Sequence, residues 1–156
     1  MTALLNVKNI DKSFGRLNAN KNISFDVASG EIVAILGENG AGKTTLMNII
    51  FGHYVADSGL INFNGNELKA GDTKAAIDAG IGMVHQHFTL AENLTVLENI
   101  LVGTQPLYQP RLSEGKAKEK LKYLATEFGL ELSPQQLVRN LSVGEKQRLE
   151  ILKTLF

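Results

Sequence analysis

Apolar and polar residues alternate along the first part of the chain. Leu5 and Val7 fall on one face of an extended segment, and "ISFDV" at residues 23–27 repeats the period of two more clearly. A strand that buries one face alternates in this way. The two segments therefore predict an antiparallel pair of strands that turns through residues 16–20.

The apolar pattern then changes from alternating to continuous. Residues 32–36, "IVAIL", are apolar on both faces, which predicts a strand buried inside a parallel sheet. A helix is predicted over residues 43–51, and "GLINFNG" at residues 59–65 predicts a strand with an Asn-Gly turn. A helix near residues 73–79 and a strand near residues 81–84 follow. Strands that alternate with helices in this order predict an α/β sheet.

Beyond Leu94 the sequence favours helices. Helix starts need a side chain that accepts hydrogen bonds from free backbone N–H groups, and serine or threonine followed three residues later by glutamate has the spacing of a capping box. The predicted helix starts are Thr95 with Glu98, Ser113 before a charged helix that ends at Gly129, Ser133 before Pro134, and Ser142 with Glu145. We therefore expect a β-rich part over residues 1–88 and a helical part over residues 89–156.

The composition restricts the possible functions. The chain has 156 residues, of which 44% are hydrophobic and 21% charged, typical of a globular protein with a buried core. Sixteen basic residues balance sixteen acidic ones, so no nucleic-acid partner is expected. Apolar runs are shorter than the roughly 18 residues of a membrane-spanning helix, and no secretory signal is visible. The absence of cysteine excludes disulfides and thiolate metal sites, and a cytoplasmic location is expected.

The stretch "GENGAGKT" at residues 37–44 matches the pattern G-x-x-x-x-G-K-[ST] of a phosphate-binding loop. It lies directly after the predicted buried strand and opens the predicted helix, where backbone N–H groups and the helix N-terminus face an anion. A polyphosphate would fit this loop, with Lys43 reaching its β- and γ-phosphates and the Thr44 hydroxyl binding Mg²⁺. A glycine turn without a ligand is the alternative, but it leaves Lys43 unexplained. The candidate nucleotide-binding residues are Gly37, Glu38, Asn39, Gly40, Ala41, Gly42, Lys43, Thr44 and Thr45.

A phosphate-binding loop followed about a hundred residues later by "LSVGE" at residues 141–145 resembles the ATP-binding cassette family, the ATPase subunits of ABC transporters. The family signature is usually LSGGQ; here Val143 and Glu145 differ, as in a variant common among sugar and nucleoside importers. The resemblance implies a P-loop NTPase core with an N-terminal antiparallel β subdomain and a helical subdomain. It also implies that Ser142 and Gly144 bind the γ-phosphate of ATP held by a second cassette in a head-to-tail dimer. A capped helix start is the simpler alternative for this segment.

Two further positions match the family. The resemblance implies that Phe14 stacks on adenine and that Gln86 approaches Mg²⁺ and the attacking water, as both a catalytic and a metal-site residue. Phe14 could instead be a core residue, and His85 with His87 could form a metal pair, although the sequence offers no evident third ligand. The string at residues 81–103 resembles the nucleoside and simple-sugar importer branch, where this region faces the membrane subunit.

The family continues after the signature with an apolar strand ending in Asp-Glu and then a switch histidine, and this sequence contains neither. We therefore expect a domain truncated before its catalytic strand, with exposed apolar segments at residues 32–36 and 81–84 and no ATP turnover. The parent would couple MgATP hydrolysis to nucleoside or sugar import, with transmembrane permease subunits, at the cytoplasmic face of the membrane. The alternatives are a stand-alone or vestigial nucleotide-binding module and another P-loop enzyme such as a small kinase, which would leave "LSVGE" unexplained.

Overall fold

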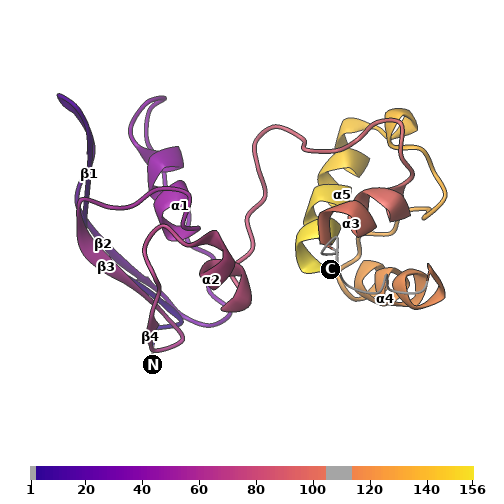
Figure 1. Ribbon diagram of the computed structural model, residues 1–156, viewed down its shortest axis with the longest axis horizontal. Coiled ribbons are helices and arrows are strands. Elements are labelled where there is room, and N and C mark those ends of the chain that lie inside the picture. Colours follow the sequence, from indigo (N-terminus) through magenta and orange to yellow (C-terminus); the bar gives the residue numbers. More distant parts are fainter. Residues whose placement is uncertain (1–2, 105–113) are drawn as a thin grey trace. The chain divides into compact units, whose positions relative to one another are not determined.

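The computed structural model describes residues 3–104 and 114–156. The chain divides into two compact units, Met1–Gly82 and Met83–Phe156 (Figure 1). Within the described residues, the first unit holds an antiparallel sheet with helices α1 and α2, and the second holds α3, α4, a short 3-10 helix and α5. The boundary expected at residue 88 from the sequence stays a prediction.

The sheet of the first unit has the strand order β2-β1-β3-β4, and every neighbouring pair is antiparallel. Its strands are β1 (Leu5–Phe14), β2 (Leu17–Val27), β3 (Ser58–Phe63) and β4 (Asn66–Glu67). The predicted pairing of the first two strands is confirmed. Their turn lies at residues 15–16 and not over residues 16–20, because Phe14 pairs directly with Leu17. Gly15, with φ 61°, supplies the left-handed backbone that such a short turn requires.

The predicted Asn-Gly turn is confirmed. Asn64 and Gly65 join β3 to β4 and have φ values of 49° and 78°. Positive φ at both central residues gives the hairpin turn whose twist matches that of the flanking strands. The turn therefore fixes the register in which Phe63 pairs with Asn66.

Two helices complete the first unit: α1 (Lys43–Ile50) and α2 (Thr73–Asp78). Both lie close to their predicted positions. The Asp72 side chain caps α2 by accepting a 3.0 Å hydrogen bond from the backbone N–H of Ala75. One apolar face of α1 packs on residues of β1 and β3. The buried core of this unit comprises Val7, Ile10, Leu46, Ile49, Ile50 and Ile61.

The strands predicted at residues 32–36 and 81–84 are wrong for this structure. Both segments are irregular, and Ile32 and Leu36 are 97% and 90% exposed. A strand that is buried on both faces needs hydrogen-bonded neighbours along its edges. None of the strands in the described part of the chain pairs with either segment. The expectation that these two segments expose apolar surface is confirmed.

The second unit is helical: α3 (Val96–Thr104), α4 (Glu114–Glu127), the 3-10 helix η1 (Val138–Asn140) and α5 (Val143–Leu155). The helices bury apolar residues spaced three or four apart, which places these residues on one face of each helix. The core of the unit comprises Val96, Leu97, Ile100, Ala117, Leu121, Ala125, Val138, Leu141, Leu149 and Leu152.

The predicted capping box at the start of α3 is confirmed. The Thr95 backbone N–H donates to the Glu98 carboxylate at 2.8 Å, and the Glu98 N–H donates to the Thr95 hydroxyl at 3.2 Å. The predicted cap at Ser113 lies outside the described residues. Gly129, with φ 65°, lies two residues beyond α4, so the predicted end of that helix is confirmed.

The helix predicted to begin at Ser133 and Pro134 is wrong. This segment forms a turn, and its backbone bonds to the start of α3. The N–H groups of Val96 and Leu97 donate to the carbonyls of Gln136 and Pro134, each at 3.0 Å. The first N–H groups of a helix have no partner within it. The 134–136 segment supplies those partners, so its carbonyls are not available for a helix of its own.

Candidate functional site

The phosphate-binding motif forms the loop that leads into α1. Lys43 is the first residue of the helix, and its side chain folds back over the loop. Its Nζ donates to the backbone carbonyls of Gly37 and Glu38 at 2.6 and 2.7 Å. The ammonium group is thereby fixed above the loop by oxygen atoms that carry only partial charge. An incoming phosphate oxygen would be a stronger acceptor for the same donors.

Gly42 is the loop residue that lies against strand β2 of the sheet. Its φ of 84° is in the left-handed region, and a Cβ built on it would lie 1.9 Å from the carbonyl oxygen of Ala19 on β2. The contact is with backbone, which cannot rotate away as a side chain would. Gly40 has a similar φ of 85° but faces open space. Glycine is therefore favoured at residue 40 by the backbone conformation alone, and required at residue 42 by conformation and space together.

The N-terminus of α1 is left open for an anion. In the described part of the chain, no side chain caps this helix and its first turn contains no acidic residue. The first turn of a helix presents unpaired N–H groups and the positive end of the helix dipole. The hydroxyl of Thr44 lies in this turn on an exposed residue, while Thr45 is half-buried. The segment combines donors, one cation and a hydroxyl in one place, as the binding of a phosphate with a metal ion requires.

Phe14 lies at the tip of the β1–β2 hairpin and is 46% exposed, so it is not a core residue. Its ring packs edge-on against Tyr54, with 5.7 Å between ring centroids. The Nζ of Lys12 lies 5.4 Å from the Phe14 ring centroid, and Asp57 holds it there with a 2.7 Å ion pair. Hydrogen bonds from Lys12 and from the Ser13 backbone lower the pKa of Asp57. The ring is therefore oriented by neighbours and accessible for stacking.

Gln86 belongs to an exposed irregular segment at the start of the helical unit. Its neighbours His85 and His87 are exposed as well. Over residues 3–104 and 114–156, no group of three or more His, Asp or Glu side chains is arranged to hold a metal ion. The structure thus adds no third ligand to the two histidines.

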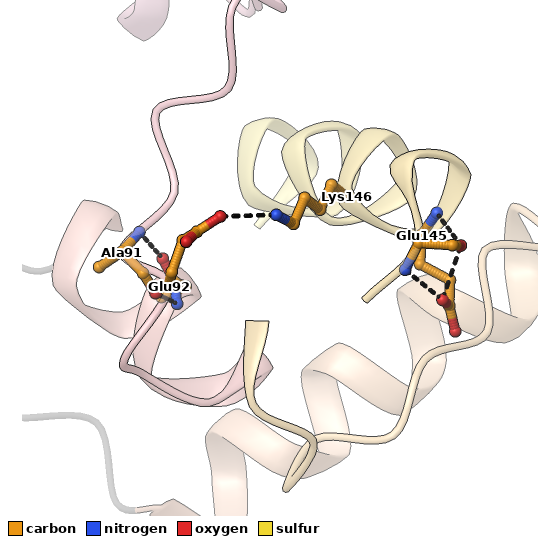
Figure 2. A network of polar contacts seen from close by, with 6 residues as sticks. Ala91, Glu92, Glu145 and Lys146 are labelled. Carbon is orange, nitrogen blue, oxygen red and sulfur yellow. Dashed lines mark hydrogen bonds and ion pairs between the residues drawn. The ribbon is translucent and has the colours of Figure 1, made fainter. Parts of the chain in front are cut away.

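The segment that contains Gln86 is attached to α5. The backbone N–H and the hydroxyl of Thr89 both donate to the carboxylate of Glu150, which is 4% exposed. One turn earlier on α5, Lys146 forms a 2.7 Å ion pair with Glu92 (Figure 2). Residues four apart lie on the same helix face. The sequence analysis did not predict this polar face of α5. The feature of the sequence that could have indicated it is the four-residue spacing of Lys146 and Glu150.

Backbone hydrogen bonds of Ala91 attach the same segment to α3. Its backbone N–H donates to the Asn99 side chain at 2.8 Å, and its carbonyl accepts from the Asn99 amide at 2.9 Å (Figure 2). Asn99 is buried, so these bonds form away from water. A segment without regular secondary structure is in this way held at several points by side chains of two helices.

Ser142 is the N-cap of α5, and the predicted capping box is confirmed. The Ser142 hydroxyl and backbone N–H donate to the Glu145 carboxylate at 2.7 and 2.8 Å, and the Glu145 N–H donates back to the hydroxyl at 3.4 Å. Figure 2 shows Glu145 bonded in this way at the start of the helix. A Cβ on Gly144 would meet no atom within 4 Å, so the helix start is open to an approaching group.

The capping box makes the stability of the helical unit depend on pH through Glu145. The pKa of this carboxyl lies below its ordinary value of 4.5, because the Ser142 hydroxyl and then the Ser142 N–H donate to the ionised form. A lowered pKa stabilises the folded state fully above the unfolded value, and the contribution is lost as pH falls through the folded value. We therefore expect the difference in unfolding free energy between wild type and Glu145→Gln to be constant at neutral pH and to change in strongly acidic solution.

Urea unfolding followed by circular dichroism at a series of pH values measures this difference. Glutamine can keep the capping contacts without the charge, so the comparison isolates the titration of Glu145. A difference that stays the same down to the most acidic pH at which the chain folds would contradict the charged capping box.

The model of the ABC transporter family matches residues 20–156. The chain belongs to the ABC transporter family. It is 43% identical over 156 residues to the guanosine import ATP-binding protein NupO of Bacillus subtilis, covering 100% of this chain and 31% of NupO. The ribose import ATP-binding protein RbsA of Clostridium perfringens (strain SM101) is 39% identical over 156 residues, covering 99% of this chain and 31% of RbsA. The chain thus spans about a third of these relatives.

Solved structures of ABC cassettes have the same fold. A nucleotide-free ATP-binding cassette from an ABC transporter is 28% identical, with a TM-score of 0.82, over 99% of this chain and 65% of that one. A cassette in its ADP conformation is 32% identical, with a TM-score of 0.83 and the same coverage. The expected α/β cassette fold is confirmed. No helix in the described ranges has both the length and the apolar character to cross a bilayer.

Proposed function

We propose that this chain is the ATP-binding part of an ABC importer ATPase subunit, in which MgATP binding and hydrolysis drive uptake of a solute. The observation that carries the proposal is the position of Lys43, whose ammonium lies over the loop carbonyls at the open N-terminus of α1. In the bound state its donors move from the carbonyls of Gly37 and Glu38 to phosphate oxygens. Charge-assisted hydrogen bonds are roughly twice as strong as neutral ones, which favours this exchange.

Mg²⁺ would bind between the phosphates and the protein. The Thr44 hydroxyl would supply one oxygen ligand to the metal ion, and the family resemblance implies that the side-chain oxygen of Gln86 would supply another and would orient the attacking water. A glutamine amide orients water but does not remove a proton at neutral pH. The base therefore has to come from an acidic residue outside the motifs of this chain, such as the Asp-Glu pair that the family places on its next strand.

Ser142 and Gly144 would contact the γ-phosphate of ATP bound to a second cassette. The open space at Gly144 and the N-terminus of α5 suit an approaching anion. The Ser142 hydroxyl would transfer its hydrogen bond from Glu145 to the phosphate. A bacterial ABC cassette solved as a dimer, 27% identical with a TM-score of 0.75 over 97% of this chain and 68% of that one, supports an assembly of this kind.

The solute is proposed to be a nucleoside or a simple sugar. The names of two similar proteins, which refer to guanosine import and to ribose import, support this class. The longer protein would bind transmembrane permease subunits, and the cassette would lie at the cytoplasmic face of the membrane as a peripheral subunit. Residues 81–103, which resemble the importer branch, are the proposed contact with the membrane subunit.

Replacing Phe14 by alanine tests whether the ligand is a nucleotide. If the ring stacks on adenine, the change weakens MgATP binding by about 1 to 3 kcal/mol, the range measured when aromatic platforms for bases are removed. Tripolyphosphate has no base, so its affinity should stay within a factor of about two. Isothermal titration of wild type and variant with both ligands measures the two effects.

Phe128→Ala is the matched control, because Phe128 is an exposed phenylalanine of the other unit. It should bind both ligands as wild type does. Equal losses for MgATP and tripolyphosphate in Phe14→Ala would assign Phe14 a structural role. Failure of the wild-type chain to bind either ligand would overturn the proposed function.

A further inference from the structure

Asn20 is a buried polar residue behind the phosphate-binding loop. It lies on β2 and is 7% exposed. Its side-chain Nδ2 donates a 3.2 Å hydrogen bond to the carbonyl of Gly42. Its Oδ1 is also buried and has no hydrogen-bond partner among the residues that the structure describes. A polar atom buried without a partner lowers stability, so an amide at this position needs a reason other than folding.

The carbonyl of Gly42 is held by two donors. The first is Asn20 Nδ2, and the second is the backbone N–H of Leu46 at 2.9 Å, which is the first hydrogen bond of α1. No peptide bond in the described residues is cis. In a planar trans peptide the carbonyl and the following N–H point in opposite directions. Fixing the Gly42 carbonyl toward β2 and α1 therefore directs the N–H of Lys43 away from Asn20.

We propose that Asn20 is a positioning residue for phosphate binding, which orients the Gly42–Lys43 peptide so that the Lys43 N–H and ammonium bind the same polyphosphate. The proposal rests on the proposed nucleotide-binding function. Asn20 itself would touch no ligand; it acts through the hydrogen bond to Gly42, a residue that lies so close to β2 that a Cβ on it would be 1.9 Å from the Ala19 carbonyl oxygen. Asn20 lies outside both sequence motifs, residues 37–44 and 141–145.

A positioning role and a purely structural role predict different results. Asn20→Leu keeps the approximate size of the side chain, removes the unpaired Oδ1 and leaves the Gly42 carbonyl bonded to Leu46. Its melting temperature should equal or exceed that of wild type, because the buried unpaired atom is gone. Its affinity for tripolyphosphate and MgATP should fall by about tenfold, the effect of one well-placed hydrogen bond. Loss of affinity without loss of stability is not expected of a structural residue.

Asn20→Ala provides the second variant, because it also removes Nδ2 but leaves a cavity. It should show a similar loss of affinity with a lower melting temperature. Asn6→Leu is the control: Asn6 has a buried unpaired Oδ1 too, but its amide donates to Asp26 on the neighbouring strand. This variant should bind tripolyphosphate as wild type does.

The experiment is isothermal titration of the full chain and its variants with tripolyphosphate and MgATP, together with thermal unfolding. Wild-type affinity in folded Asn20→Leu would overturn the proposal, as would a loss for MgATP that spares tripolyphosphate. If these variants bind normally while Lys43→Ala does not, the proposed function stands and the role of Asn20 falls. Wild-type protein that fails to bind tripolyphosphate would overturn both.

Discussion

Lys43→Ala is expected to weaken MgATP binding by about 100-fold or more, because it removes the only motif side chain that carries a positive charge to the phosphates. The ammonium already lies over the loop, bonded to the carbonyls of Gly37 and Glu38. Each of its hydrogen bonds to a phosphate oxygen would be charge-assisted. Alanine leaves the backbone of the loop in place, so the loss of ATP affinity measures the contribution of the lysine side chain alone. Titration with fluorescent ATP, followed by anisotropy, measures the change.

Lys69→Ala is the matched control for this experiment. Lys69 is an exposed lysine of the same unit, and it forms a surface ion pair with Asp72. Surface ion pairs contribute about 0 to 1 kcal/mol, so the variant should fold and bind ATP normally. Equal affinity of Lys43→Ala and wild type would remove the assignment of residues 37–44 as a phosphate-binding loop.

Gly42→Ala is expected to destabilise the loop and the first turn of α1 and to abolish measurable nucleotide binding. The new Cβ would lie 1.9 Å from the Ala19 carbonyl oxygen, a distance that only a shift of the backbone can relieve. The left-handed backbone at φ 84° adds strain for any residue with a Cβ. Together these effects should lower the free energy of unfolding by about 2 to 4 kcal/mol. Urea unfolding measures the stability, and titration with MgATP measures the binding.

Gly40→Ala separates the effect of the left-handed backbone from the effect of the close contact with Ala19. Its φ of 85° imposes the same backbone strain, but the added methyl group would face open space. We expect a cost of about 1 to 2 kcal/mol from the backbone alone and detectable nucleotide binding. Equal effects of the two substitutions would mean that the contact between Gly42 and β2 has no influence on the loop.

Local features of the fold were predictable because neighbouring residues determine them. The turn at Asn64 and Gly65, and the capping boxes that begin at Thr95 and Ser142, use side chains and backbone groups within four residues of one another. The position of the phosphate-binding loop at the start of α1 follows in the same way from the glycines and Lys43. In such patterns the residues that interact are also close together in the sequence, so the sequence alone predicts the interaction.

Predictions that depended on distant partners were less successful. Residues 32–36 have the composition of a buried strand, but a strand forms only beside another strand, and no described strand lies along them. Ser133 and Pro134 have the composition of a helix start, but the carbonyls that follow are bonded to the first turn of α3. In both cases the backbone hydrogen bonds available from the rest of the fold decided the conformation.

The sequence by itself determined which chemical groups are available: a lysine and a hydroxyl at a glycine-rich helix start, and a further helix start, capped by Ser142, that carries the family signature. Only the tertiary structure decided which residues hold those groups in place. Asn20 meets Gly42 across 22 positions of the chain, and Glu150 meets Thr89 across 61. Neither pair has a spacing that a helix or strand period would reveal, because packing between elements brings these side chains together.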